Sequence, residues 1–183
     1  MKTLPTDLPG VLLIETDRRR DERGGFARWF CDTDLADALQ DATIRQINHS
    51  HTVKRGSVRG MHFQHAPHAE KKIIRCLTGK IFDVVVDLRH GSPTFLAWRG
   101  FELEEGDDRA LLIPEGCAHG FQTLTDEVQM LYLHTAPYTP AAEGALRFDE
   151  PRVAIAWPLP PQHLSERDLQ HPLLGADFSG INL

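Results

Sequence analysis

The stretch KIIRCLTGKIFDVVVDLRHG, residues 72–91, contains two β-rich runs joined at Thr78-Gly79. In the second run, alternate residues fall on opposite faces of a strand, with Phe82, Val84, Val86 and Leu88 on one face and Ile81, Asp83, Val85 and Asp87 on the other. Turn residues separate further short runs at 95–104, 109–116, 120–124 and 127–135. This succession predicts a mainly β fold, either a sandwich or a barrel.

Only two segments carry helix signals. The segment DTDLADALQ, residues 32–40, can form a helix that starts at Asp32 or Thr33. The segment SERDL, residues 165–169, places Ser165 three residues before Asp168, which is the spacing of a capping box. We therefore expect one small helix in the first quarter of the chain and a helical tail.

The composition indicates a single globular domain, residues 1–183, because hydrophobic residues (41%) and charged residues (25%) occur in ordinary proportions. The net charge of -6 argues against binding to nucleic acid, which requires a basic face. Three cysteines without a C-x-x-C spacing give neither a disulfide framework nor a thiolate metal cluster. No apolar stretch reaches the length of a signal peptide core or a membrane span, so we expect a cytoplasmic protein without membrane association.

Two of the expected strands carry polar side chains on one face. Gln46, Asn48 and Ser50 share a face in IRQINHS, residues 44–50. Tyr132 and His134 share a face in EVQMLYLHT with apolar neighbours. Such a polar face is typical of a sheet that faces solvent, and it is also typical of strands that line a ligand site in the mouth of a barrel. The pattern alone leaves both interpretations open.

The segment RGMHFQHAPHAEKK, residues 59–72, is rich in histidine and basic residues. His62, His65 and His68 recur at every third position, whereas two metal ligands on one strand need a spacing of two to point the same way. Pro67 also interrupts the extended run before His68. The sequence therefore predicts no metal, and we expect His65 and His68 to lie in a solvated loop.

Eight segments taken together carry a family resemblance. They are DERGGF (21–26), QINHS (46–50), RGMHFQ (59–64), KKIIRCLTGKIFDVVVDLR (71–89), SPTF (92–95), IPEGCAHGF (113–121), LYLHTAPY (131–138) and LSERD (164–168). In this order and spacing the chain resembles the dTDP-4-dehydrorhamnose 3,5-epimerase family. The resemblance implies a homodimer of cupin jelly rolls (double-stranded β-helices) with a few short helices and no cofactor. It implies inversion of C3 and C5 of a nucleotide-diphospho-4-keto-6-deoxy sugar, dTDP-4-dehydro-6-deoxy-D-glucose.

The resemblance also implies a role for each matching position. His62 matches the general base, Asp168 matches the carboxylate paired with it, and Tyr132 matches the general acid. Tyr138 matches the aromatic residue that stacks on the nucleotide base, and Arg167 lies where the family often has a basic contact. The positions that match substrate contacts are Arg23, Gln46, Asn48, Arg59, Lys72, His119 and Glu143.

One substrate-contacting position departs from the family pattern. The family usually reads RGxFxE, whereas residues 23–28 read RGGFAR, so Arg28 stands in place of a glutamate. A positive charge then replaces a negative one near the ligand. Arg28 therefore bears on which nucleotide sugar is bound and on whether both carbons are inverted.

These residue types suit the implied reaction. The C4 ketone acidifies the protons at C3 and C5 by resonance, so a base, an acid on the opposite face and a stabiliser of the enolate charge suffice. His62 suits the base because the unperturbed pKa of histidine lies near working pH. Asp168 would support the His62 imidazolium, or else serve as the capping-box carboxylate. Lys72 suits the enolate oxygen, whereas Lys71 should face solvent.

Several points stay open at the level of sequence. In a regular strand Arg59 and His62 point to opposite faces, and a bulge at Gly60 would be needed to re-aim one of them. A single-carbon (3- or 5-) epimerase or a 3,4-ketoisomerase acting on a related 4-keto nucleotide sugar would share much of the site. A non-catalytic or metal-binding sugar-binding cupin would share only the fold.

Overall fold

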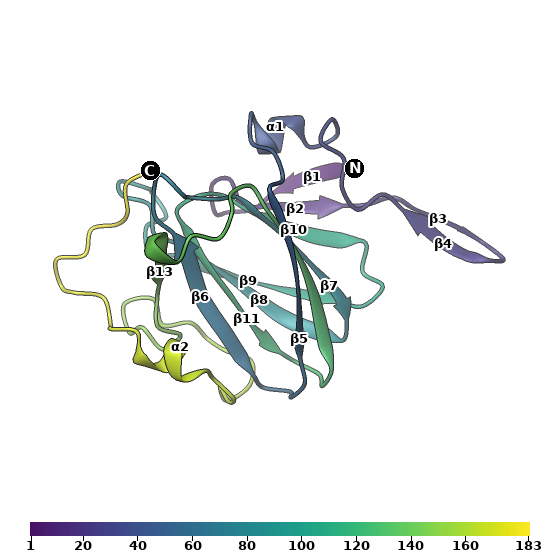
Figure 1. Cartoon of the computed structure of the whole chain (residues 1–183). Coiled ribbons are helices and arrows are strands. Elements are labelled where there is room, and N and C mark those ends of the chain that lie inside the picture. The colour runs from purple at the N-terminus through teal and green to yellow at the C-terminus, as the bar shows by residue number, and fades with distance from the viewer.

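The computed structural model describes residues 1–183 as two antiparallel sheets that face each other (Figure 1). The strands of the six-stranded sheet are, in spatial order, Lys2–Pro5 (β1), Leu12–Glu15 (β2), Arg109–Ile113 (β10), Lys72–Thr78 (β7), Val128–His134 (β12) and Gln46–Thr52 (β5). Those of the five-stranded sheet are Glu143–Ala145 (β13), Val58–Gln64 (β6), Cys117–Thr123 (β11), Lys80–Asp87 (β8) and Trp98–Glu104 (β9). The mainly β prediction is confirmed.

One hairpin and three short helical segments complete the architecture. A separate hairpin of Arg18–Asp21 (β3) and Gly24–Ala27 (β4) projects from the body of the molecule (Figure 1). The helices are α1 (Ala36–Leu39), α2 (Glu166–Gln170) and the 3-10 turn η1 (Pro140–Ala142). None of them has the length and apolar character that a membrane-spanning helix requires.

The strands β7 and β8 follow each other directly in the chain but belong to opposite sheets. The chain crosses between the sheets at Gly79, which has a φ of 78°. A Cβ atom at this position would lie 2.6 Å from Thr125 Oγ1 and 2.9 Å from Val128 Cγ2. Both the backbone conformation and the close approach therefore require glycine here.

The alternation predicted for β8 places its two faces in two different hydrophobic clusters. Ile81 and Val85 belong to the cluster between the sheets. Val84 and Val86 belong to a second cluster, in which Ile181 and other residues of the C-terminal segment cover the outer face of the five-stranded sheet. Both faces of β8 are therefore buried, which explains why apolar residues occur on both faces and make up five of its eight positions.

The predicted helix start near residue 32 is wrong by three to four residues, because α1 begins at Ala36. Residues 32–35 form turns, and the Ala36 N–H bonds to the Thr33 carbonyl oxygen three residues earlier (3.4 Å) rather than to the residue four earlier. Leu35 is buried and packs with Leu39 against the outer face of the six-stranded sheet. The helix therefore begins directly after Leu35, the first residue of this segment that packs against the sheet.

The prediction that Lys71 faces solvent is also wrong. Lys71 is 6% exposed, and its ammonium group donates to the carbonyl oxygens of Ala38 (3.1 Å) and Leu39 (3.0 Å). These carbonyls lie at the C-terminal end of α1, where a helix has no internal donors for them. Lys71 thus anchors the helix to the start of β7.

The carboxylate of Asp87, at the end of β8, is fully buried. It accepts hydrogen bonds from Arg89 Nε (2.9 Å), Ser92 Oγ (2.6 Å) and Thr94 Oγ1 (2.6 Å). Burial raises the pKa of Asp87, but these hydrogen bonds outweigh burial and lower the pKa from 3.8 to about 2. Because the folded-state pKa is the lower one, the carboxylate stabilises the fold above about pH 4, and this contribution is lost as the pH falls toward 2.

We expect the Asp87→Asn substitution to lower the free energy of unfolding by about 2 kcal/mol at neutral pH. The deficit should shrink as the pH is lowered below about 4, and urea denaturation over this range measures it. The control is Asp149→Asn. Because Asp149 pairs with Arg147 at the partly exposed surface, we expect this substitution to lower the free energy of unfolding by less than about 0.5 kcal/mol. A deficit for Asp87→Asn that is independent of pH would show that packing, not charge, is responsible.

Candidate active site

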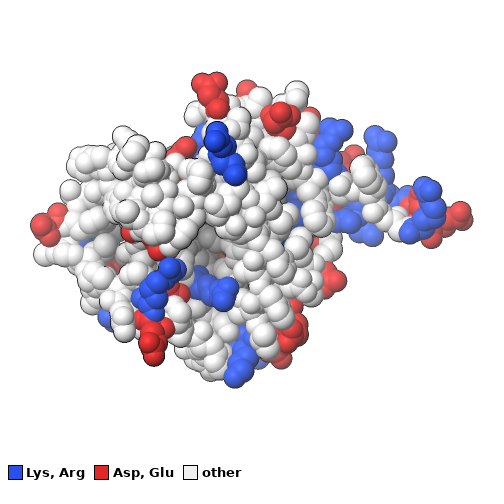
Figure 2. All heavy atoms as spheres, in the orientation of Figure 1, with Lys and Arg blue, Asp and Glu red and all other residues white.

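A cavity of about 830 Å³ opens between the two sheets. Its walls come from β5, β7 and β12 of one sheet, from β6 and β11 of the other, and from the segment 163–168 that leads into α2. Figure 2 shows this face of the molecule hollowed near its centre, with Lys and Arg side chains in and beside the hollow. Part of each polar face predicted for residues 44–50 and 127–135 lines this cavity and does not face open solvent. The lining residues from these faces are Asn48, Ser50, Tyr132 and His134.

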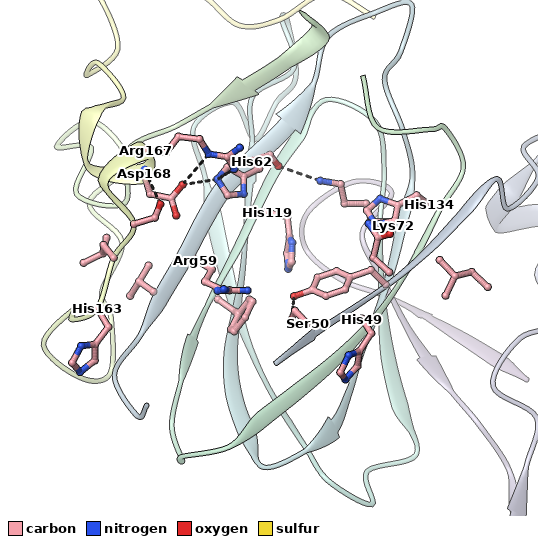
Figure 3. A pocket seen from close by; sticks show the side chains of 17 residues that line it. His49, Ser50, Arg59, His62, Lys72, His119, His134, His163, Arg167 and Asp168 are labelled. Atoms are coloured by element: carbon pink, nitrogen blue, oxygen red, sulfur yellow. Dashed lines mark hydrogen bonds and ion pairs between the residues drawn. The ribbon is translucent and has the colours of Figure 1, made fainter. Parts of the chain in front are cut away.

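The helix α2 brings an aspartate to a histidine on the cavity wall. His62 Nε2 donates to Asp168 Oδ1 at 2.8 Å, while Ser165 Oγ accepts from the Asp168 N–H at 3.0 Å (Figure 3). The cap and the histidine therefore do not compete, because Ser165 caps the helix and the Asp168 carboxylate stays available for His62. Burial raises the pKa of Asp168, but the hydrogen bond and charge of His62, together with hydrogen bonds that involve Gly60 and Ser165, outweigh burial, and the pKa is lowered overall.

The strand β6 contains the bulge that the sequence required. His62 pairs with His119 and Arg59 pairs with Phe121, so three steps along β6 match only two along β11. As a result, Arg59 and His62 both line the cavity. Gly60 lies inside this bulge with a φ of 128°, and a Cβ there would meet the Gly120 Cα at 2.5 Å.

Tyr132 lies on β12 in the sheet opposite to His62. Its ring packs against the core between the sheets, while its hydroxyl lies 3.0 Å from Ser50 Oγ in the cavity. Burial raises the pKa of Tyr132 to about 12, so the hydroxyl keeps its proton at neutral pH. The Tyr132 ring therefore contributes to the core, while its protonated hydroxyl lies in the cavity.

Five residues form a hydrogen-bonded rim beside the cavity. The Tyr138 hydroxyl donates to Glu143 (2.9 Å), and Arg167 donates to the same carboxylate (3.2 Å). The Tyr138 N–H donates to Gln46 Oε1 (2.9 Å), and the Gln46 amide donates to Asn48 Oδ1 (3.1 Å). Asn48 and Arg167 themselves line the cavity. The structure thus brings this whole predicted set to one edge of the cavity.

Residues 5–176 match the family model of dTDP-4-dehydrorhamnose 3,5-epimerase. The chain belongs to this family. It is 39% identical over 178 residues to the dTDP-4-dehydrorhamnose 3,5-epimerase of Salmonella typhimurium, covering 95% of this chain and 96% of that protein. It is equally identical, over 184 residues, to a dTDP-4-dehydrorhamnose 3-epimerase of Streptomyces niveus, covering 100% of this chain and 88% of that protein.

A crystal structure supports the same relationship. The 3,5-epimerase of Legionella pneumophila, solved with dTDP-4-keto-L-rhamnose, superposes with a TM-score of 0.90 at 32% identity, covering 98% of this chain and 97% of that one. The predicted cupin jelly roll is confirmed by this likeness. The protein is accordingly an enzyme, an epimerase that acts on carbohydrates.

Behind the cavity wall of this epimerase lie two buried carboxylates that sequence reasoning did not select, and each contacts residues that line the cavity. Asp83 accepts from His119 Nε2 at 2.8 Å. Glu70 contacts Lys72 Nζ at 3.2 Å and His134 Nδ1 at 2.9 Å. The sequence signal that could have identified Asp83 is an acidic residue within a mostly apolar strand. Glu70 offers no such signal, because it lies among other polar and charged residues.

These two carboxylates fix the orientation of the cationic and imidazole groups in the cavity. Burial raises the pKa of Asp83, while hydrogen bonding and charge from His119 oppose that shift. Burial also raises the pKa of Glu70, but His134 and Lys72 outweigh burial, and the pKa is lowered overall. Glu70 is therefore ionised and neutralises part of the positive charge of the Lys72 ammonium group.

Two predicted substrate contacts of the epimerase, Arg23 and Arg28, belong neither to the cavity lining nor to the hydrogen-bonded rim. Arg23 is at the tip of the β3–β4 hairpin, with an 85% exposed side chain paired to Asp21 (2.6 Å). Arg28 follows the hairpin and pairs with Asp34 (3.3 Å). Within one chain, neither arginine reaches the residues that line the cavity.

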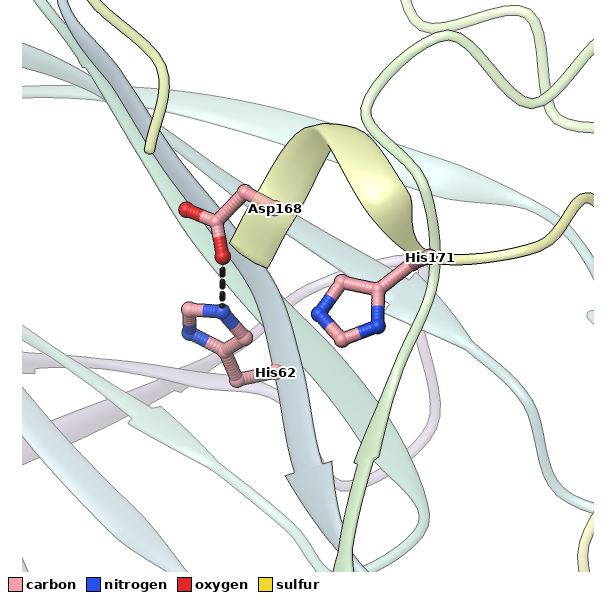
Figure 4. Close-up of side chains that lie close together, drawn as sticks. All are labelled: His62, Asp168 and His171. Carbon is pink, nitrogen blue, oxygen red and sulfur yellow. Dashed lines mark hydrogen bonds and ion pairs between the residues drawn. The ribbon is translucent and has the colours of Figure 1, made fainter. Parts of the chain in front are cut away.

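The histidine-rich loop behaves as expected, but another histidine approaches the site. His65 and His68 are exposed and do not line the cavity. His171, which directly follows α2, lies beside His62 and Asp168 (Figure 4). The sequence showed it only as a single histidine in the C-terminal tail.

Proposed function

We propose that this enzyme inverts C3 and C5 of dTDP-4-dehydro-6-deoxy-D-glucose to give dTDP-4-dehydro-L-rhamnose. The observation that carries the proposal is the placement of two proton-transfer groups on opposite walls of one cavity. The His62–Asp168 pair comes from one sheet and its adjoining helix, and the protonated Tyr132 hydroxyl comes from the other sheet. Inversion requires this arrangement, because the proton leaves from one face of the carbon and returns to the other.

In this mechanism His62 removes the proton next to the C4 ketone. Its Nε2–H is held by Asp168, so Nδ1 is the nitrogen that accepts the proton, and the carboxylate stabilises the imidazolium that forms. The ammonium group of Lys72 stabilises the negative charge of the enolate oxygen. Glu70 lies 3.2 Å from this ammonium group and holds it in place. Tyr132 then delivers a proton from the opposite wall. The C4 ketone supplies the acidity, so the mechanism needs no metal or redox cofactor.

The nucleotide half of the substrate fits the rim of the cavity. We assign the base-stacking role to Tyr138, whose half-exposed ring is fixed at its hydroxyl by Glu143. We assign the diphosphate to Arg59 and Arg167, since the guanidinium fork matches phosphate oxygens. We also propose a cytoplasmic location, which is consistent with three free cysteines.

Product stereochemistry distinguishes this proposal from a single-carbon epimerase. The second function stays a candidate because the Streptomyces niveus relative, named a 3-epimerase, is as similar to this chain as the Salmonella 3,5-epimerase. We expect proton coupling constants of the product to show inversion at both C3 and C5 after incubation with dTDP-4-dehydro-6-deoxy-D-glucose. A product inverted only at C3 would assign the enzyme to the single-carbon class.

We further propose a homodimer in which the β3–β4 hairpin of one chain completes the cavity of the other. Arg23 matches a substrate contact, yet it lies on an arm that projects away from its own cavity (Figure 1). The arm also carries Phe26, which is 75% exposed, and leads to the half-exposed Trp29. Exposed aromatic residues beside arginines are typical of a contact surface. Arg28, which follows the arm, would approach the same partner cavity.

This arrangement predicts complementation between two defective variants. Arg23→Ala and His62→Asn chains, co-expressed and purified as mixed dimers with two tags, should regain about half of wild-type activity, since one of the two sites is then intact. The control is a mixed dimer of His62→Asn and Tyr132→Phe, in which each cavity keeps one defect and activity should stay low. Failure of the first pair to regain activity would place Arg23 outside the partner cavity.

A further inference from the structure

His171 presents a buried nitrogen that has no partner. It directly follows α2, three residues after Asp168, and its Nε2 is shielded from solvent without any hydrogen bond. Its ring meets the His62 ring edge-on, with 6.4 Å between the centroids and 74° between the planes. Figure 4 shows the His171 ring beside the His62–Asp168 hydrogen bond. An unpaired buried polar atom costs about 1–3 kcal/mol, so this nitrogen calls for a physical explanation.

The three side chains together form a ligand set for a transition metal. One ligand atom of His62, one of Asp168 and one of His171 all lie within 4.8 Å of one another. Two imidazole nitrogens and one carboxylate are a common set for Zn²⁺, at bond lengths of about 2.0–2.2 Å. A tetrahedral ion would bring these atoms to about 3.3 Å from one another, so His171 must move inward. Asp168 lies on α2 and His171 is the first residue after this short helix. A small movement of this segment is therefore sufficient to bring His171 to the ion.

We propose that His62, Asp168 and His171 form an inhibitory site for Zn²⁺ and similar transition-metal ions. Binding would use the lone pair of His62 Nε2, and the ring proton that Nε2 now donates to Asp168 would move to Nδ1. Nδ1 then carries a hydrogen and cannot accept a proton from the sugar. Metal binding and catalysis therefore exclude each other. The binding site is independent of the proposed function, whereas the inhibition rests on it.

Arg167 opposes the ion electrostatically. One of its guanidinium nitrogens lies 3.4 Å from His62 Nε2, and another lies 4.0 Å from Asp168 Oδ1. Its side chain is 55% exposed and already donates to Glu143, so the guanidinium group can turn further toward solvent when an ion binds. We therefore expect Arg167→Ala to bind the metal more tightly than the wild type.

The test uses the full chain, freed of metal with EDTA and dialysed, with Co²⁺ and Zn²⁺ as probes. We expect one equivalent of Co²⁺ to give the visible absorption of a low-symmetry site and Zn²⁺ to displace it. Zn²⁺ should also inhibit turnover, and EDTA should restore it. The variant His171→Gln should keep its activity and need at least about tenfold more Zn²⁺ for half-inhibition. The control is His65→Gln, an exposed histidine outside the cavity and outside the trio, which should behave as the wild type.

Each arm of this test has a clear contrary result. Absence of stoichiometric Co²⁺ or Zn²⁺ binding to the wild type would overturn the site, and a water molecule bound to His171 would then explain its buried nitrogen. Equal binding by the wild type and His171→Gln would overturn it as well. If the wild type binds the metal but shows no epimerase activity, the proposed function fails while the metal site stands.

Discussion

Replacing His62 with asparagine should abolish measurable proton exchange at both C3 and C5 while nucleotide binding stays intact. His62 lines the cavity with one ring nitrogen held by the buried carboxylate of Asp168 on α2, which leaves the other ring nitrogen free to accept a proton. Asparagine keeps a similar size but has no nitrogen that accepts a proton. A positioned general base contributes about 10²–10⁴-fold, so the exchange rate should fall by at least that factor. Proton NMR of the substrate in D₂O measures the exchange, and titration with dTDP measures binding.

The matched control is His65→Asn, three residues further along the chain. His65 is exposed, does not line the cavity and should be replaceable without effect on exchange. Near-normal exchange in His62→Asn would remove His62 from the mechanism. A parallel loss of dTDP binding would instead mean that the substitution disturbs the cavity as a whole.

Replacing Tyr132 with phenylalanine should separate exchange from inversion. The ring packs against the core and is kept in the variant, whereas the hydroxyl beside Ser50 is lost. His62 can still remove a proton and return it to the same face, so deuterium should still enter the substrate. Without a donor on the opposite wall, however, inversion at C5 should become about 10²-fold slower or more relative to exchange.

Tyr138→Phe is the control, because it also removes one phenolic hydroxyl but lies on the rim, bonded to Glu143. It should change substrate affinity without changing the ratio of inversion to exchange. If exchange and inversion fall together in Tyr132→Phe, or if neither changes, then Tyr132 does not deliver the returning proton.

Sequence reasoning succeeded where local geometry decides the outcome. The alternation in residues 80–87 predicted the two faces of β8, and both are found in hydrophobic clusters. The conflict between Arg59 and His62 on one strand predicted the bulge at Gly60. The Ser165 cap follows directly from the Ser-x-x-Asp spacing. In each case the pattern that supports the prediction lies within a few residues along the chain.

Sequence reasoning failed where partners are distant along the chain. Glu70 meets His134 across 64 residues, and Asp83 meets His119 across 36. Lys71 was predicted to face solvent, because no residue near it in the sequence indicates that its ammonium group contacts the C-terminal end of α1. The pairing of strands β7 with β12 and β8 with β11 creates these contacts, and register between distant strands is not encoded in any one segment.

The most direct test of the account is the number of deuterium atoms that the wild-type enzyme introduces. The substrate dTDP-4-dehydro-6-deoxy-D-glucose should be incubated with the enzyme in D₂O, and the product analysed by NMR and mass spectrometry. We predict one deuterium at C3 and one at C5, because the proposed mechanism has His62 and Tyr132 transfer protons at both carbons next to the ketone. Deuterium at C3 alone would contradict inversion at both carbons, and its absence from both positions would contradict the proton-transfer mechanism itself.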